Sequence, residues 1–134
     1  MTKDDVRDYI ASFNALQFDG FGKYYADDVQ LNLSGKQTLN SRDEILNFYR
    51  EVAKVCREKL DITRIVMDDE GVAIEVKTEF KALVDKPDFI AGPLIPGQSI
   101  FITSRIFYEL NKQGRFQKID AMRVGNMTTG PATF

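Results

Sequence analysis

Two charged side chains stand within segments that otherwise read as strands. Asp120 lies between Ile119 and Ala121 in "RFQKIDAMRV", and Arg105 lies in "SIFITSRIFYEL". Aspartate is depleted in strands and is costly to bury without a partner. Asp120 therefore has three interpretations: a solvated outer position, half of a cross-strand ion pair with Arg105, or the acid of a pocket. In a pocket it could act as a general acid or base, with Arg105 stabilising an oxyanion.

The sequence contains no histidine, which removes the commonest catalytic designs. A Ser-His-Asp triad, a Cys-His pair and a histidine-based metal site are all excluded. The single cysteine, Cys56, lies on the apolar stripe of a predicted helix, where it is typical of a small core residue. Acid–base chemistry would have to use Asp, Glu, Lys or Tyr, and we expect neither a metal nor another cofactor.

Length and composition indicate an ordinary globular protein. The chain has 134 residues, of which 43% are apolar and 28% charged, so we expect one domain with one core. The net charge of −2 is spread along the chain, and no basic stripe favours nucleic acid. No apolar run approaches the roughly 18 residues of a membrane span. The charged N-terminus and the single cysteine favour a cytoplasmic location.

Helical periodicity comes first along the chain. It predicts helices over 2–16, 21–26 and 41–56, with a strand over 29–33 between the second and the third. Thr2 is the expected N-cap of the first helix. The third begins with the capping-box pattern of Ser41 and Glu44.

Strand patterns follow, and they fix the fold class. The predicted strands are 59–67, 72–83, 99–110 and 115–124, with a loop over 84–98 that contains three of the four prolines. Helices followed by strands predict the α+β class, with a curved antiparallel sheet wrapped around the N-terminal helices. Residues 126–134 show no periodicity and are expected to form a C-terminal tail.

This order resembles the nuclear-transport-factor-2-like superfamily. The resemblance rests on "YYADDVQL" after the first helices and on "SRDEILNFYREV" in the next one, and it covers residues 3–125. The superfamily includes SnoaL-like polyketide cyclases, ketosteroid isomerase and limonene epoxide hydrolase. The resemblance implies a single SnoaL-like domain over 1–125, a cone-shaped, cystatin-like α+β roll. It also implies a pocket for a small apolar ligand and a homodimer formed through the sheet.

The resemblance also implies site residues. Tyr9, Tyr25 and Tyr49 match tyrosines at the floor of the ketosteroid isomerase pocket. The two aspartate positions of that enzyme fall at Leu33 and Arg105, so its mechanism does not carry over. SnoaL-like cyclases and epoxide hydrolases place an acid on the last strand, close to Asp120. The histidine of the cyclases is missing here.

Alternation leaves open which face of the last two strands points inward, and the resemblance implies that it is the face with Arg105 and Asp120. The predicted catalytic residues are Asp120 and Arg105, and the predicted substrate-binding residues are Tyr9, Phe13, Tyr25, Tyr49, Phe101, Phe107 and Met122. The expected function is a metal-free isomerase, cyclase or hydrolase acting on a polyketide- or terpenoid-like substrate. The alternatives are a non-catalytic binding module and an association domain whose cone is filled by side chains.

Overall fold

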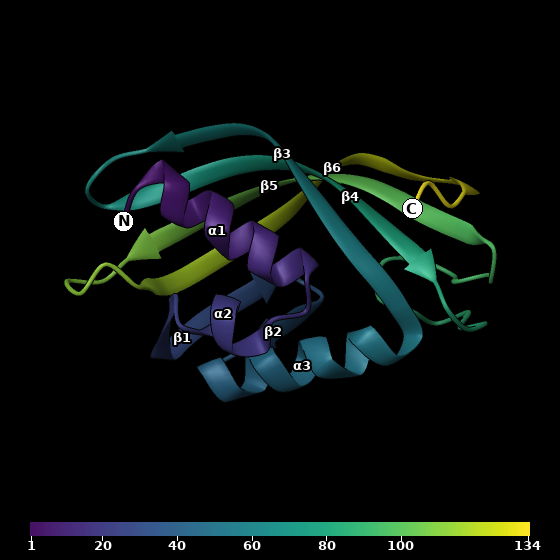
Figure 1. The fold of residues 1–134 in the computed structure, drawn as a ribbon, viewed down its shortest axis with the longest axis horizontal. Helices are drawn as coiled ribbons and strands as arrows, with labels where there is room; N and C mark the ends of the chain where they lie inside the picture. Colours follow the sequence, from purple (N-terminus) through teal and green to yellow (C-terminus); the bar gives the residue numbers. More distant parts are fainter.

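The computed structural model describes all 134 residues and confirms the predicted α+β class. Its elements are α1 (Lys3–Asn14), α2 (Phe18–Gly22), β1 (Tyr25–Leu33), β2 (Gln37–Leu39), α3 (Arg42–Val55), β3 (Cys56–Met67), β4 (Gly71–Ala82), β5 (Gln98–Leu110) and β6 (Phe116–Pro131). The strands form one curved, open sheet in the order β2-β1-β6-β5-β4-β3 (Figure 1). Neighbouring strands are antiparallel except β1 and β6, which are parallel.

Both predicted N-caps are confirmed. The Thr2 hydroxyl accepts a hydrogen bond from the Asp5 amide at 3.1 Å, and the Asp5 carboxylate accepts one from the Thr2 amide at 2.8 Å, which completes a capping box. Ser41 accepts from the Glu44 amide at 3.1 Å, but the Glu44 carboxylate accepts from Asn40 rather than from Ser41. No helix has both the length and the apolar character needed to cross a membrane.

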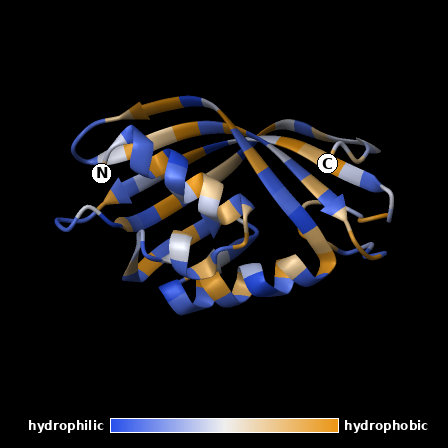
Figure 2. Ribbon diagram, in the orientation of Figure 1, coloured by the Kyte–Doolittle hydropathy of each residue, from blue (hydrophilic) through white to orange (hydrophobic).

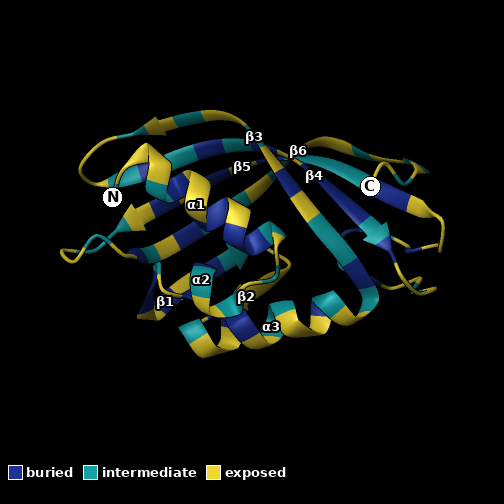
Figure 3. Cartoon of the chain, viewed as in Figure 1, coloured by how far each residue is buried: buried dark blue, intermediate teal, exposed yellow.

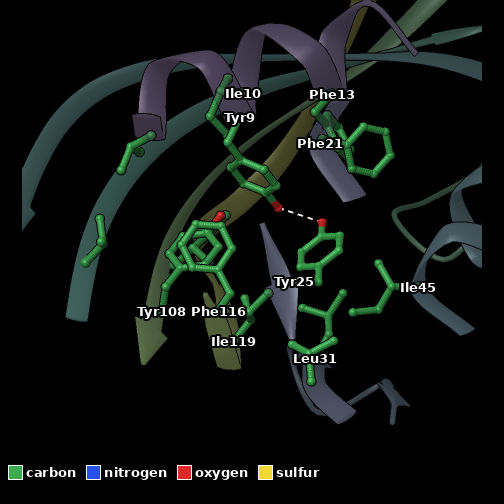
Figure 4. Close-up of a cluster of buried hydrophobic side chains, with 14 of the residues drawn as sticks. Tyr9, Ile10, Phe13, Phe21, Tyr25, Leu31, Ile45, Tyr108, Phe116 and Ile119 are labelled. Atoms are coloured by element: carbon green, nitrogen blue, oxygen red, sulfur yellow. Dashed lines mark hydrogen bonds between the residues drawn. The ribbon is translucent and has the colours of Figure 1, made fainter. Parts of the chain in front are cut away.

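The main core lies between α1 and the concave face of the sheet. Buried and exposed bands alternate along the strands (Figure 3), as do hydrophobic and hydrophilic bands (Figure 2). Tyr9 of α1 packs edge-on against Tyr25, Tyr108 and Phe116 at centroid distances of 5.7, 5.8 and 5.0 Å (Figure 4). This aromatic group fixes how α1 sits under the sheet.

A second, smaller core lies under the loop between β4 and β5. Phe89 of the loop packs edge-on against Phe80 at 5.5 Å, and Ala91 and Leu94 are buried in the same cluster. A backbone bridge between Lys86 and Leu94 gives the loop a defined shape. The predicted irregular segment is therefore confirmed, and it is anchored to the sheet.

The prediction of a C-terminal tail over 126–134 is wrong for most of that segment. β6 continues to Pro131, with Thr128 opposite Phe101 on β5. Beyond the strand, the Thr133 amide donates to the Glu79 carboxylate at 2.9 Å. Burial works to raise the pKa of Glu79, but hydrogen bonds from Ser99 and Thr133 outweigh it and hold the pKa below its usual value. Residues 126–131 form a strand because they pair with β5. This pairing could not be predicted from the local sequence, which shows no periodicity there.

Candidate functional site

A cavity opens between α1, α3 and the concave face of the sheet. Its volume is about 120 Å³, and its walls are predominantly apolar, with Ile10, Phe13, Val76 and Ile106 among them. This is smaller than the roughly 300 Å³ at the lower end of sites for drug-sized ligands. It is close to the roughly 150 Å³ of an engineered apolar cavity that holds benzene. The cavity therefore suits a compact molecule of about one ring.

Glu58 is the one acidic side chain on the cavity wall. It lies on β3 between Cys56 and Leu60, both buried, at the inward phase of the strand. Its carboxyl makes no hydrogen bond and no ion pair within the protein, although every fully buried side-chain oxygen in the structure has a partner. The oxygens of Glu58 therefore reach the open space of the cavity and can meet a ligand there.

Burial changes the protonation of Glu58. Removal from water raises the pKa of its carboxyl from 4.5 to about 8, and no neighbouring cation offsets this effect. Most Glu58 side chains are therefore protonated at neutral pH. A carboxylic acid in this form can donate a hydrogen bond or a proton, and after donation it can act as a base.

Tyrosine hydroxyls lie around the same cavity. Tyr9, Tyr49 and Tyr108 line it, and the Tyr9 and Tyr25 hydroxyls are hydrogen-bonded at 2.7 Å (Figure 4). Burial raises the pKa of each of these four phenols well above 10, and the nearby Glu58 carboxyl raises that of Tyr49 further. They remain neutral hydrogen-bond donors throughout the physiological pH range.

We call the more exposed part of the cavity wall its mouth, and its residues come from a turn, a strand and the β4–β5 loop. Ser34 and Lys36 come from the three-residue turn between β1 and β2, in which Ser34 and Gly35 both have positive φ. Arg123 of β6 lies on the rim as well. Its Nη2 donates to the carbonyl oxygen of Ala91 in the loop at 3.4 Å.

The predicted inward position of Asp120 and Arg105 is wrong. Neither residue lines the cavity, because both lie on the outer face of the sheet. The Arg105 side chain is 60% exposed, and its Nε pairs with the Glu75 carboxylate on β4 at 3.1 Å. Asp120 stands opposite Phe107, which is itself 50% exposed. The structure therefore gives Arg105 a cross-strand partner, but that partner is not Asp120.

A β-bulge in β6 sets which of its side chains point inward. Leu110 pairs with Phe116, whereas the preceding Glu109 pairs with Lys118, so Gln117 is an extra residue in β6. The bulge shifts the alternation by one position, and Phe116 and Ile119 both point inward. Alternation alone had left the inward face of this strand open, and the resemblance to the superfamily had placed Asp120 on it.

The predicted substrate-binding residues divide between the two faces. Tyr9, Phe13 and Tyr49 line the cavity, as expected. Tyr25 lies behind Tyr9 and is fully buried without lining the cavity. The remaining three lie on the outer face of β5 and β6, contrary to the prediction: Phe101, Phe107 and Met122.

Glu58 was missed because the predicted strand began at residue 59. The structure starts β3 at Cys56, directly after α3 and without an intervening turn. Alternation from Cys56 to Leu60 places Glu58 on the inward phase, so the pattern was readable once the boundary was known. No group of three or more His, Cys, Asp or Glu side chains is arranged to hold a metal ion.

Comparisons with known proteins agree with this architecture. A family model described as the SnoaL-like domain matches residues 6–119, while no curated protein matches the chain. A candidate polyketide cyclase from Pseudomonas putida superposes with a TM-score of 0.75 at 20% identity, covering 91% of this chain and 89% of that one. An LEH-like epoxide hydrolase from M. tuberculosis superposes with a TM-score of 0.72 at 14% identity, covering 90% and 80%. At these identities the likeness is one of fold.

Proposed function

Because the chain belongs to the SnoaL-like domain family, we propose that it is an enzyme in which a cavity carboxyl acts as acid and base on a compact apolar substrate. The reaction class is isomerisation, cyclisation or hydrolysis, without a metal. The observation that carries the proposal is Glu58, a carboxyl without a protein partner, on the wall of an apolar cavity and with its pKa raised to about 8. Ionisable groups shifted in this way inside a cleft are typical of functional sites.

The chemistry follows from the protonation of Glu58. In its neutral form it would donate a proton to a carbonyl, hydroxyl or epoxide oxygen of the substrate. The resulting carboxylate would then take a proton from a substrate carbon or from an attacking water. Such catalysis contributes about 10²- to 10⁴-fold, most efficiently when the pKa lies near the working pH. A hydrogen bond from Tyr49 would orient the reacting oxygen.

The apolar walls have two roles in this proposal. They limit the contact of the carboxyl with bulk water, which maintains its raised pKa. They also give binding energy to an apolar ring, at roughly 25 cal/mol per Å² removed from water. Ring closure by a polyketide cyclase and opening of an epoxide by a hydrolase both involve proton movement at oxygen. The structural neighbours with those names therefore support the same class of reaction.

The test is the pH dependence of turnover by the unmodified protein. A panel of single-ring epoxides, enones and hydroxyketones would be incubated at pH values from 5 to 10, and product would be measured by mass spectrometry. We expect turnover of at least one substrate class, with a rate that falls above a pH of about 8 because the acid form of Glu58 is lost. A rate that rises through this range would contradict the acid role. Binding without turnover would favour the non-catalytic module.

We further propose that a second copy of the chain covers the outer face of the sheet. Phe107 and Met122 are each 50% exposed there, and Val124 on the same face is 37% exposed. Exposed apolar side chains on adjacent strands mark an interaction surface, and a two-fold dimer places the same patch on both subunits. This position is consistent with the predicted homodimer through the sheet.

Substitution in this patch tests the dimer. Met122→Glu is expected to convert a dimeric wild-type protein into a monomer, because two carboxylates would be brought together in an apolar contact. Light scattering after size exclusion would measure the mass. Val66→Glu, at a similarly exposed residue of β3, should leave the mass unchanged. A monomeric wild-type protein at micromolar concentration would contradict the proposal.

A further inference from the structure

Two cations stand on the cavity wall without carboxylate partners. Lys36 and Arg123 line the mouth, and neither takes part in any ion pair of the structure, in contrast to Arg42 and Arg105. The only acidic group on the wall is Glu58, which is mostly uncharged at neutral pH. A cavity with apolar walls therefore carries net positive charge at its mouth, in a protein whose overall charge is −2.

Of these two cations, Arg123 is better placed to bind an anionic ligand. It is half-buried, and its side chain makes one hydrogen bond, the 3.4 Å contact from Nη2 to the Ala91 carbonyl oxygen. A guanidinium has five N–H donors in a planar fork, so most of its donors have no acceptor within the protein. Partial burial of an under-satisfied cation costs free energy, which an anionic ligand would offset.

We propose that the substrate is a compact apolar molecule that bears a carboxylate, and that Arg123 binds this carboxylate at the mouth. This inference rests on the proposed function, because it concerns the same cavity. The two coplanar oxygens of a carboxylate match the guanidinium fork, and Lys36 adds electrostatic attraction from the exposed turn. With its acid group held at the mouth, the apolar body of the substrate extends between the aromatic walls toward Glu58.

A matched pair of ring compounds tests the charge requirement. Cyclohexanecarboxylate and cyclohexanecarboxamide have nearly the same size, and only the first carries a charge. We expect isothermal titration at pH 7 to show that the wild-type protein binds the carboxylate about tenfold or more tightly than the amide. Raising the salt concentration should weaken the binding of the carboxylate but not that of the amide, because salt screens the attraction between charges.

Variants assign the preference to the two cations. Arg123→Gln is expected to weaken carboxylate binding about tenfold while leaving amide binding within about twofold. Lys36→Gln should weaken carboxylate binding about threefold, because its exposed charge is screened. Lys118→Gln makes the same change in net charge on an exposed residue of β6 outside the cavity, and it should change neither affinity.

Each failure has a distinct meaning. Equal affinity of the wild-type protein for both probes overturns the carboxylate inference and leaves the proposed enzyme intact. Binding of neither probe also overturns the carboxylate inference, whereas the proposed enzyme is decided separately by the turnover panel. If Arg123→Gln weakens the binding of both probes equally, Arg123 acts through its contact with the loop at Ala91. That result overturns the role of Arg123 as the carboxylate ligand. If Arg123→Gln has a lowered melting temperature, the exposed Lys36→Gln variant still decides whether charge at the mouth matters.

Discussion

Glu58→Gln is expected to lose about a hundredfold or more in kcat, with KM changed only slightly. Glutamine keeps the size and planarity of the side chain, so the apolar walls that bind the substrate remain in place. It has no proton that it can transfer to oxygen at neutral pH, and general acid–base catalysis typically contributes about 10²- to 10⁴-fold. Because the lost interaction forms in the transition state, the effect should fall on kcat.

Asp120→Asn is the matched control for this variant. It makes the same acid-to-amide change, on the outer face of the sheet and away from the cavity. We expect it to retain turnover within about twofold. The residual activity of Glu58→Gln should also lack the alkaline decline of the wild-type rate. If Asp120→Asn were inactive and Glu58→Gln active, the acid of the last strand would be the catalytic one and the cavity proposal would be wrong.

The fold could be predicted because its signals are local. Ser41 and Thr2 mark helix starts through side-chain hydrogen bonds to amides three residues later, and both contacts form as expected. Alternation of apolar residues located β3, β4 and β5 within a few residues of their observed ends, but it missed the part of β6 beyond Val124. The order of helices and strands then limited the architecture to one curved sheet over helices.

The site could not be predicted equally well, because it depends on strand phase. One extra residue, Gln117, reverses which side chains of β6 point inward, and nothing in its chemistry marks a bulge. The start of β3 was equally decisive, since Glu58 enters the cavity only if Cys56 already belongs to the strand. A change of phase by one residue exchanges the two faces of a sheet, so alternation left the face of Asp120 open and the resemblance placed it inward.

The Glu58→Gln variant is also expected to be more stable than the wild-type protein at alkaline pH. The folded-state pKa of Glu58, about 8, lies above its ordinary value of 4.5. The folded protein therefore holds this proton more tightly than the unfolded chain does. The wild-type stability linked to Glu58 is fully present below a pH of about 4.5, falls as the pH rises toward 8 and is lost above it.

The size of the effect follows from the two pKa values. The interval from 4.5 to about 8 corresponds to roughly 5 kcal/mol at 1.36 kcal/mol per pH unit. Water that reaches the half-buried carboxyl through the cavity lowers this to about 3 kcal/mol. Cys56, whose pKa burial raises to about 12, stays uncharged across this range, as do Tyr25, Tyr49 and Tyr108 with pKa values well above 10. Ionisation of the unfolded Cys56 thiol near pH 9 lowers the stability of both proteins equally, so it cancels from the difference between them.

Urea unfolding at pH values from 4.5 to 9 would measure this difference. The free energies of unfolding of Glu58→Gln and the wild-type protein should be similar at the acid end and should diverge by about 3 kcal/mol at pH 9. Glu109→Gln, which makes the same change at an exposed residue of β5, should track the wild-type protein at every pH. If the difference in free energy of unfolding between Glu58→Gln and the wild-type protein were the same at every pH, the pKa of Glu58 would not be raised by folding. A raised pKa that costs stability is expected of a catalytic group, because a residue serving only the fold would gain nothing from an unpartnered carboxyl in an apolar cavity.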